Sequence, residues 1–392
     1  MNKLFVLATL IALLLGGCSK NNFPIIENQK NVEIRTIIEA KSIASNYQFL
    51  HSENPLKANK SFSSTEKVQA LTVNMLHGAQ VNFNGKSSTG DTLLYYVPNE
   101  DGGMIVSRNK ACLPVLAILD NNDFSFENIL NNKQANIGIF SFLISALDYN
   151  NSPETLIFPP VDLPNDGSDG GSTKGPVTLV DEVLPKVHVE WGQSGDPFDR
   201  YTPSHYPSGC VATAVAQAFT VTRHIGMFNN VPLNFDDLIQ FRNRGFLELF
   251  PNQADIVGRF MREIGVAVDM KYTSDGSGAR TSDGAKLFSD FGMNISKNKA
   301  DIKKTLRTYS NGIILIGSRT EKDFLGIPKG TGHAYLADGY RVFSDGTDMI
   351  HVNYGWGPST NGYFLTVLNS PHWTDDAPKT YPHEWEFYCI YR

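Results

Sequence analysis

A stretch of small and polar residues divides the chain and limits how it can fold. Residues 159–176 contain four prolines among Gly, Ser and Asp, with almost no side chain able to fill a core. This composition is typical of an exposed linker and of a site of proteolytic nicking. We therefore expect two folded units, at 18–160 and 177–392, joined by a flexible, cleavable linker at 161–176.

The overall composition excludes several classes of protein. Hydrophobic residues make up 41% and aromatic residues 11%, which is enough to build packed cores. The net charge of −6 argues against a protein that binds nucleic acid, because such proteins are usually basic. The nine His residues are scattered and no CxxC pair occurs, so we expect neither a zinc site nor another cofactor.

The first residues predict export. Lys3 precedes the apolar run Leu4–Leu15, which is typical of a signal peptide over 1–17 and too short to span a bilayer. The run Leu15-Gly16-Gly17-Cys18 is similar to a bacterial lipobox, in which the Cys becomes the lipidated first residue. An ordinary secretory signal is the alternative. Both predict a protein outside the cytoplasm. The lipobox predicts an exported lipoprotein of the cell envelope, periplasmic or facing the surface, from which a mature part could be released.

The first unit shows mixed secondary-structure patterns without evident chemistry. Helical spacing occurs over residues 30–50 and 124–149. Short apolar runs predict strands at 93–97, 104–106 and 115–119. Cys112 adjoins the last strand and is expected to be a small core residue.

Cys210 is the candidate nucleophile of the second unit. It follows Gly209 and precedes Val211, Val215 and Phe219, whose spacing of four predicts a buried helix beginning near Cys210. The free N–H groups and positive dipole end of a helix stabilise a thiolate. The alternative from this segment alone is a structural Cys at the start of a core helix.

A histidine and two possible partners lie far downstream. His333 follows a glycine-rich turn and begins an alternating strand pattern, where it could face a cleft or be structural. A second strand delivers Asn353, and Trp356 follows between two glycines. Asn can hold an imidazole in the required tautomer, and Trp can shield that hydrogen bond from water. The alternative is a hairpin with turn glycines and a core Trp.

Gln193 completes the set of catalytic roles. It lies in Trp191-Gly192-Gln193, upstream of Cys210. Its side-chain amide and the backbone N–H of Cys210 together would form an oxyanion hole. A lone Gln would indicate nothing. The order Gln, Cys, His, then Asn or Trp is what makes Gln193 a candidate oxyanion donor.

These segments resemble the streptopain (C10) family of papain-like cysteine peptidases. The resemblance rests on four motifs: Trp191-Gly192-Gln193, Gly209-Cys210-Val211-Ala212-Thr213-Ala214, Gly332-His333-Ala334 and Val352-Asn353-Tyr354-Gly355-Trp356-Gly357. The family usually has Trp where this chain has Tyr354. Gly276, Ser277, Gly278 and Ala279 resemble the segment that lines the family's substrate cleft, and residues 103–107 and 114–117 resemble its inhibitory prodomain.

The resemblance implies an α+β fold. It implies a papain-like, two-lobed catalytic domain, with a helical lobe and an antiparallel β lobe, preceded by a small α+β prodomain. It also implies a zymogen whose Cys210 and His333 form a thiolate–imidazolium pair, with Asn353 or Trp356 orienting the imidazole. The expected partners are protein or peptide substrates with a hydrophobic residue two positions before the scissile bond, the chain's own prodomain, and a membrane through lipid on Cys18.

Two other functions are compatible with parts of the pattern. One is an inactive papain-fold module that binds or inhibits at a surface, which the complete set of four catalytic roles disfavours. The other is a thiol-dependent acyltransferase or amidase with the same Cys–His pair. The long first unit and the cleavable linker favour a protease zymogen instead.

Overall fold

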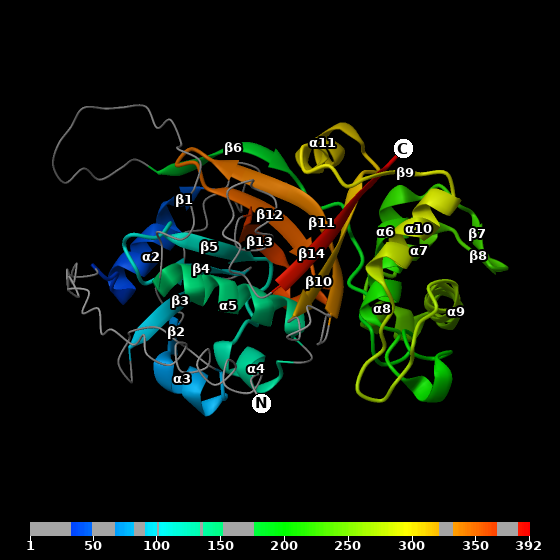
Figure 1. Ribbon diagram of the computed structural model, residues 1–392, viewed down its shortest axis with the longest axis horizontal. Helices are drawn as coiled ribbons and strands as arrows, with labels where there is room; N and C mark the ends of the chain where they lie inside the picture. Colours follow the sequence, from blue (N-terminus) through cyan, green and yellow to red (C-terminus); the bar gives the residue numbers. More distant parts are fainter. Residues whose placement is uncertain are drawn as a thin grey trace, which may run out of the picture. The chain divides into compact units, whose positions relative to one another are not determined.

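A computed structural model describes residues 33–48, 67–81, 91–99, 102–133, 136–151, 176–320, 332–366 and 383–392. The expected signal peptide, Cys18 and residues 161–175 of the expected linker lie outside this set. Glu33–Arg392 forms one compact unit (Figure 1). We call its first part, residues 33–151, the N-terminal segment. Among the described helices, none is long and apolar enough to cross a bilayer.

A mostly antiparallel sheet organises this unit. Its described strands follow the order β2-β3-β4-β5-β13-β12-β11-β10-β14-β9, and β6 pairs with β11 and, in parallel, with β1. The bounds are β1 Tyr47–Gln48, β2 Gln69–Thr72, β3 Thr92–Pro98, β4 Gly103–Ser107, β5 Val115–Leu119, β6 Val177–Val183, β9 Asn294–Ser296, β10 Ile313–Thr320, β11 Gly332–Phe343, β12 Asp348–Asn353, β13 Gly362–Leu365 and β14 His383–Tyr391.

The N-terminal segment carries short helices beside its strands. The expected strands at 93–97, 104–106 and 115–119 are confirmed as β3, β4 and β5. The helix expected over 30–50 begins only at Ile37, because Thr36 and Glu39 form a capping box there. The pattern over 124–149 corresponds to two helices. The helices are α2 Ile37–Asn46, α3 Val73–Gly78, α4 Phe126–Asn131 and α5 Ile137–Asn151.

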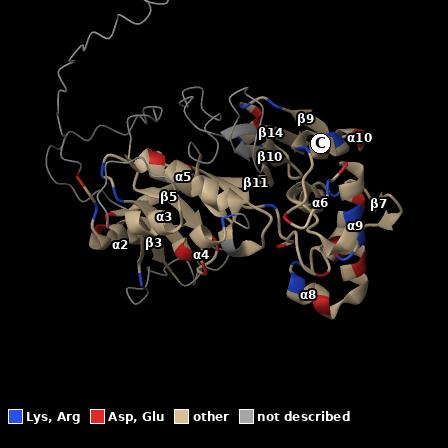
Figure 2. Ribbon diagram, turned by 60° about the horizontal axis from the view of Figure 1, so that its bottom comes forward, with Lys and Arg blue, Asp and Glu red and all other residues tan. Residues whose placement is uncertain are grey.

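Helix α5 packs against strands that precede the linker in the sequence and against strands that follow it. It is almost devoid of charged side chains, whereas α8 and α9 carry many (Figure 2). Phe142 of α5 lies edge-on to Phe364 of β13, with ring centroids 4.8 Å apart. Strand β5 pairs directly with β13, placing Ala117 opposite Phe364. The N-terminal segment therefore extends the same sheet that carries β10 to β14.

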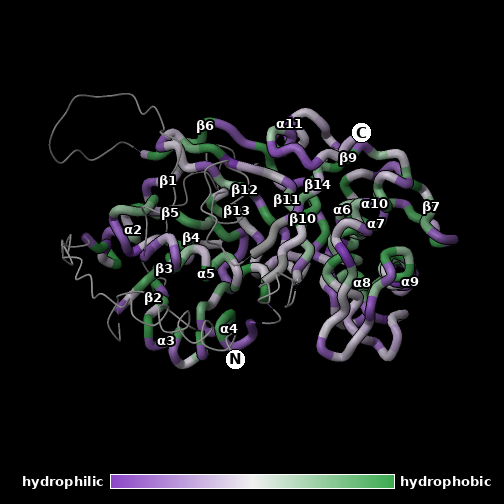
Figure 3. Tube along the Cα trace, viewed as in Figure 1, coloured by the Kyte–Doolittle hydropathy of each residue, from purple (hydrophilic) through white to green (hydrophobic). Residues whose placement is uncertain are grey.

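The remaining helices form a second lobe around the buried helix α6, Cys210–Thr222. Helices α9 and α10 pack against it (Figure 1). Helix α9 shows both hydrophobic and hydrophilic stretches, as expected for a helix with one buried face (Figure 3). The bounds are α7 Phe235–Leu238, α8 Arg244–Leu249, α9 Pro251–Ala267, α10 Thr281–Asp290 and α11 Asp301–Thr308, with a two-stranded ribbon of β7 Met227–Phe228 and β8 Val231–Pro232.

Strand β11 separates the two hydrophobic cores, because successive side chains of a strand point to opposite faces. Ala334 and Leu336 belong to the core around α6. Tyr335 and Ala337 belong to the core that includes α5. The architecture is the expected α+β fold, with a helical lobe beside a large antiparallel sheet.

Candidate active site

Cys210 is the first residue of α6. Gly209 before it has a φ of +90°, and a Cβ there would lie 2.7 Å from the Met270 sulfur, so the turn requires glycine. Burial raises the pKa of the half-buried Cys210 thiol, while hydrogen bonds from the backbone of Ala334, Val211 and Cys210 itself lower it. The helix therefore begins where the sequence predicts, with backbone donors directed at the sulfur.

Gln193 lies beside this helix start. Its backbone carbonyl accepts hydrogen bonds from the N–H and the hydroxyl of Ser208, at 2.8 and 3.1 Å. Its side chain is buried, and Nε2 has no hydrogen-bond partner among the described residues. A buried amide donor without a partner is suited to bind an oxygen that develops negative charge.

His333 is near the start of β11 but its ring points to the other core. Its Nε2 donates to the carbonyl of Tyr354 at 2.9 Å, and the ring stacks on Trp356 with centroids 6.0 Å apart. Burial lowers the pKa of His333 to about 4, although the hydrogen bond to Tyr354 opposes this. The imidazole is therefore neutral at ordinary pH.

Cys210 and His333 lie on opposite sides of β11, because neighbouring side chains of a strand point to opposite faces. Ala334 faces α6 and its backbone contacts the Cys210 sulfur, whereas the adjacent His333 shares the opposite face with Tyr335. Among the hydrogen bonds of the described residues, none joins the thiol to the imidazole. Among the described residues, the imidazole therefore hydrogen bonds to the Tyr354 carbonyl and not to the thiol.

Asn353 and Trp356 lie on different sides of the sheet. Asn353 pairs across the strands with Leu336, which faces α6, and its Oδ1 accepts from the N–H of Gly355 at 2.9 Å. Trp356 stacks on His333, and its buried Nε1 has no partner in the described part of the chain. Here, then, Trp356 contacts the imidazole, while Asn353 lies on the side of the nucleophile.

The glycine-rich segment adjoins the nucleophile. Lys271 and Gly278 exchange backbone hydrogen bonds of 2.9 and 3.0 Å, and Gly276 has a φ of +142°. The Ser277 carbonyl lies 3.0 Å from where a Cβ on Gly209 would be, and Ala279 packs on the helical core. Residues 276–279 therefore form a wall beside Cys210, together with Gln193 on the same side of β11.

The N-terminal segment reaches the site through a contact that no local sequence pattern predicts. Gly138 of α5 packs on the ring of Tyr354, and a Cβ there would lie 2.2 Å from a ring carbon. The Tyr354 carbonyl is the group that holds His333. Only the tertiary fold brings these two positions together.

A second link joins the N-terminal segment to the strands of the site. His351 of β12 is buried, with Nδ1 2.5 Å from Asp338 and Nε2 2.8 Å from Asp120. Burial opposes its charged form, yet the carboxylates of Asp338 and Asp120 raise the pKa of His351 to about 10. The other oxygen of Asp338 accepts from the backbone N–H groups of Lys186 and Val187.

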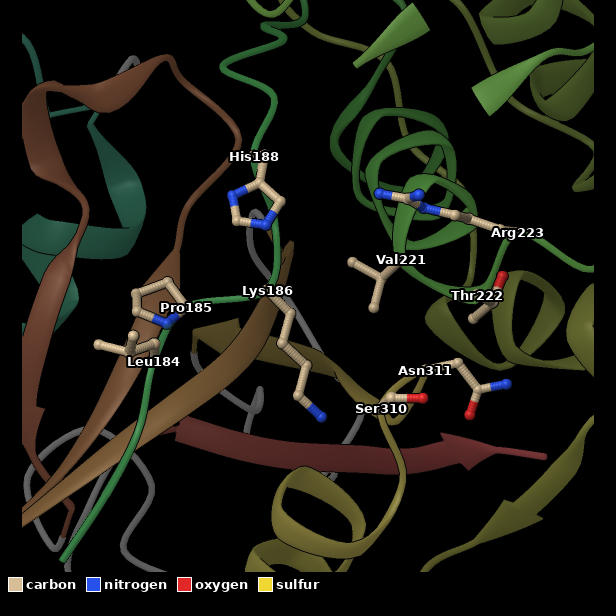
Figure 4. A pocket seen from close by; sticks show the side chains of 9 residues that line it. All are labelled: Leu184, Pro185, Lys186, His188, Val221, Thr222, Arg223, Ser310 and Asn311. Carbon is tan, nitrogen blue, oxygen red and sulfur yellow. The ribbon is translucent and has the colours of Figure 1, made fainter. Parts of the chain in front are cut away.

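A cavity of about 570 Å³ lies at the opposite end of α6 from Cys210 (Figure 4). The helix rises about 1.5 Å per residue, so this cavity is remote from the nucleophile. Its lining comprises Leu184, Pro185, Lys186, His188, Val221, Thr222, Arg223, Ser310 and Asn311. In the described residues, no group of His, Cys, Asp or Glu side chains could hold a metal ion.

The region that contains these residues is similar to a known peptidase family. The profile of the peptidase C10 family matches residues 191–364, which include Gln193, Cys210, His333, Asn353 and Trp356. Streptopain of Streptococcus pyogenes is 26% identical over 94% of each chain. The thiol protease/hemagglutinin PrtT of Porphyromonas gingivalis is 27% identical over 46% of this chain and 23% of its own.

A solved structure shares the fold. A fragment of prointerpain A from Prevotella intermedia superimposes with a TM-score of 0.52 and 18% identity, over 79% of this chain and 97% of the fragment. At that identity the likeness concerns the fold. The matched part is larger than residues 191–364, so it extends beyond the region that carries the site.

Proposed function

Because the chain belongs to the peptidase C10 family through residues 191–364, we propose that this cysteine endopeptidase is made as a latent zymogen. The N-terminal segment is its inhibitory prodomain. The observation that carries the proposal is the position of the His333 imidazole, which hydrogen bonds to Tyr354 on the face of β11 opposite Cys210. A cysteine peptidase needs the imidazole beside the thiol, so this arrangement cannot turn over substrate.

The other catalytic groups favour a latent peptidase over a protein that has lost peptidase activity. Gln193 and Cys210 lie together on the α6 side, and the Nε2 of Gln193 is without a described partner. The contact between Gly138 and Tyr354 gives the N-terminal segment a direct hold on the group that binds His333. An inactive binding module would have no need of a buried, unpaired amide beside a thiol.

Activation requires His333 to move to the α6 side of β11. There its imidazole takes the Cys210 proton, and the thiolate attacks the peptide carbonyl to form a carbon–sulfur bond. Gln193 Nε2 and the Cys210 N–H stabilise the oxyanion. His333 then protonates the leaving amine, and water hydrolyses the thioester to release the acid and restore the thiol.

Asn353 and Trp356 take different roles in this scheme. Asn353 already faces the side of Cys210, so its side-chain oxygen orients the imidazole in the active arrangement. Trp356 holds the imidazole in the latent one through ring stacking. The wall of residues 276–279 beside Gly209 receives the substrate, with a hydrophobic side chain two positions before the scissile bond.

Export and anchoring complete the proposal. A signal peptide over 1–17 directs export, lipid on Cys18 anchors the precursor in the cell envelope, and cleavage within 161–176 detaches the peptidase. Lys174 and Lys186 are the basic residues between about Pro159 and Val189, and Lys174 is the favoured cleavage position. Lys186 is disfavoured, because its Nζ donates to the carbonyls of Tyr309 and Gly312 and its backbone N–H to Asp338.

The test is to label the full chain with a thiol-reactive peptide electrophile before and after cleavage in the linker. We expect labelling and casein hydrolysis only after cleavage, and neither in Cys210→Ala, which should fold normally and lose several orders of magnitude in rate. Iodoacetamide reports whether the thiol is accessible. Absence of hydrolysis in the cleaved wild type would refute a peptidase, and efficient transfer of the acyl group to an added amine would favour an acyltransferase.

A further inference from the structure

Three successive backbone carbonyls of the Trp191-Gly192-Gln193 strap are bound by the segment that carries the nucleophile. Gln217 Nε2 donates to the Trp191 carbonyl at 2.7 Å. Thr213 Oγ1 donates to the Gly192 carbonyl at 3.3 Å. The Ser208 N–H donates to the Gln193 carbonyl at 2.8 Å. Each residue of the strap is thus fixed separately.

Two of these donors, Thr213 and Gln217, share one face of α6 with the nucleophile. Cys210, Thr213 and Gln217 are spaced by three and four residues, which aligns them along a helix. Thr213 and Gln217 are buried in a mostly apolar helix, which also buries Thr220 and Thr222 near its C-terminal end. Burying a primary amide costs free energy unless it forms hydrogen bonds, and the Oε1 of Gln217 has no partner among the described residues. An apolar side chain would fill this position at lower cost, so the amide donor needs another explanation.

We propose that Gln217, supported by Thr213, is a positioning residue that fixes the oxyanion donor Gln193 relative to Cys210. The inference rests on the proposed peptidase activity and names a further residue needed for it. The side-chain amide of Gln193 has no described hydrogen bond through its Nε2, so the strap backbone decides where that donor lies. Oxyanion stabilisation depends on donor placement to within about 0.5 Å.

Removing the Gln217 donor should therefore weaken transition-state binding and leave substrate binding intact. We expect Gln217→Met, which keeps the length and removes the donor, to lower kcat about tenfold with an unchanged KM. The loss should be smaller than the roughly 10²–10³-fold cost of deleting an oxyanion donor outright. Thr213→Val should give a smaller loss in the same direction, because its hydrogen bond is longer.

The experiment compares variants of the full chain after cleavage in the linker. It measures kcat and KM on a peptide, the affinity of a peptide aldehyde that forms a hemithioacetal with Cys210, and the rate of alkylation by iodoacetamide. We expect aldehyde affinity to fall with kcat, and the alkylation rate to be unchanged, because alkylation forms no oxyanion. Thr220→Val is the matched control, since Thr220 Oγ1 donates only within α6, to the Gln217 carbonyl.

A double-mutant cycle decides whether Gln217 acts through Gln193. In a Gln193→Ala background, Gln217→Met should cause no further loss of kcat. An equal loss in both backgrounds, a parallel fall in alkylation rate, or a wild-type kcat in Gln217→Met would overturn the inference. If Gln217→Met does not fold, the same cycle with Thr213→Val decides. A cleaved wild type without peptidase activity would instead refute the proposed function itself.

Discussion

The buried His351 imidazole and the partly exposed Asp120 carboxylate form an ion pair, 2.8 Å between Nε2 and Oδ2, that ties β12 to the residue following β5. Asp338 binds the other ring nitrogen. Arg341 and Tyr363 complete the surroundings, since the ring of Tyr363 lies edge-on to the imidazole and Arg341 lies over Tyr363. A charged bridge therefore links the N-terminal segment to the strands of the site.

Asp120→Asn should loosen the N-terminal segment after the linker is cut. The substitution keeps the shape but removes one of the two carboxylates that hold His351 charged. Because Asp120 is 39% exposed, solvent screens the pair, and its loss should cost less than the about 3–5 kcal/mol of a fully buried pair. Size-exclusion chromatography of the cleaved chain measures release of the segment. Asp123→Asn, at a nearby exposed carboxylate, is the control. Equal release from both variants would contradict the role of the bridge.

The same bridge predicts alkaline sensitivity. The pKa of His351 is raised from 6.5 to about 10. Relative to the unfolded chain, its stabilising effect is complete below pH 6.5 and is lost as the pH rises through 10. Asp338 makes the larger contribution to the raised pKa, and Asp120, the partner lost on release, makes a smaller one in the same direction. Release of the cleaved segment should increase between pH 8 and 10.5 in the wild type. His351→Gln, which cannot be charged, should show no such step, and a step of equal size in that variant would refute the assignment.

His333 predicts the opposite dependence at acid pH. Its pKa is lowered from 6.5 to about 4, so the latent arrangement favours the neutral ring. This stabilisation is complete above pH 6.5 and is lost as the pH falls towards 4, by up to about 3 kcal/mol. Thermal unfolding of the Cys210→Ala precursor should thus weaken over this range. Adding His333→Gln should remove that part of the change; identical pH profiles would exclude His333 as its source.

Gly138→Ala should speed activation by disturbing the hold on Tyr354. A methyl group there meets the Tyr354 ring at 2.2 Å, and overpacking of this kind costs about 1–3 kcal/mol. The measurement is the time course of peptidase activity after addition of a linker-cutting protease. Gly78→Ala is the matched control, because a Cβ at Gly78 meets nothing within 4 Å. The contact is irrelevant to latency if both variants activate at the wild-type rate.

Gln193→Ala should lower turnover and leave the Michaelis constant nearly unchanged. The loss of one oxyanion donor typically reduces kcat by about 10²–10³-fold. Alkylation of Cys210 should stay at the wild-type rate. A raised KM with normal kcat would assign Gln193 to substrate binding instead.

Local patterns in the sequence predicted much of this fold. The strand over 115–119 and the helix that begins at Cys210 follow from apolar runs, turn residues and spacing that act within a few residues. The boundary at Ile37 also depends on a local signal, the capping box of Thr36 and Glu39, although helical spacing alone places it earlier. Once β11 is known to be a strand, the alternation of its side chains shows that Ala334 and Leu336 share one face.

The position of the His333 ring could not be predicted in this way. It depends on which of two cores accepts the imidazole, and that choice involves Tyr354 and, behind it, Gly138 of α5. The pairing of β5 with β13 likewise joins segments far apart in the sequence. Such contacts leave no periodic pattern in the sequence, because each segment would form the same helix or strand whether or not the contact is made.

The pairing of β5 with β13 has a consequence for the proposed released enzyme, because it covers one edge of β13. If the N-terminal segment leaves as proposed, β13 loses its neighbour along Gly362, Tyr363 and Phe364 and becomes an edge strand. Unpaired N–H and C=O groups beside apolar side chains form a template for strand addition by another chain. Under the proposed activation, the peptidase therefore gains an exposed edge strand, which favours self-association at high concentration.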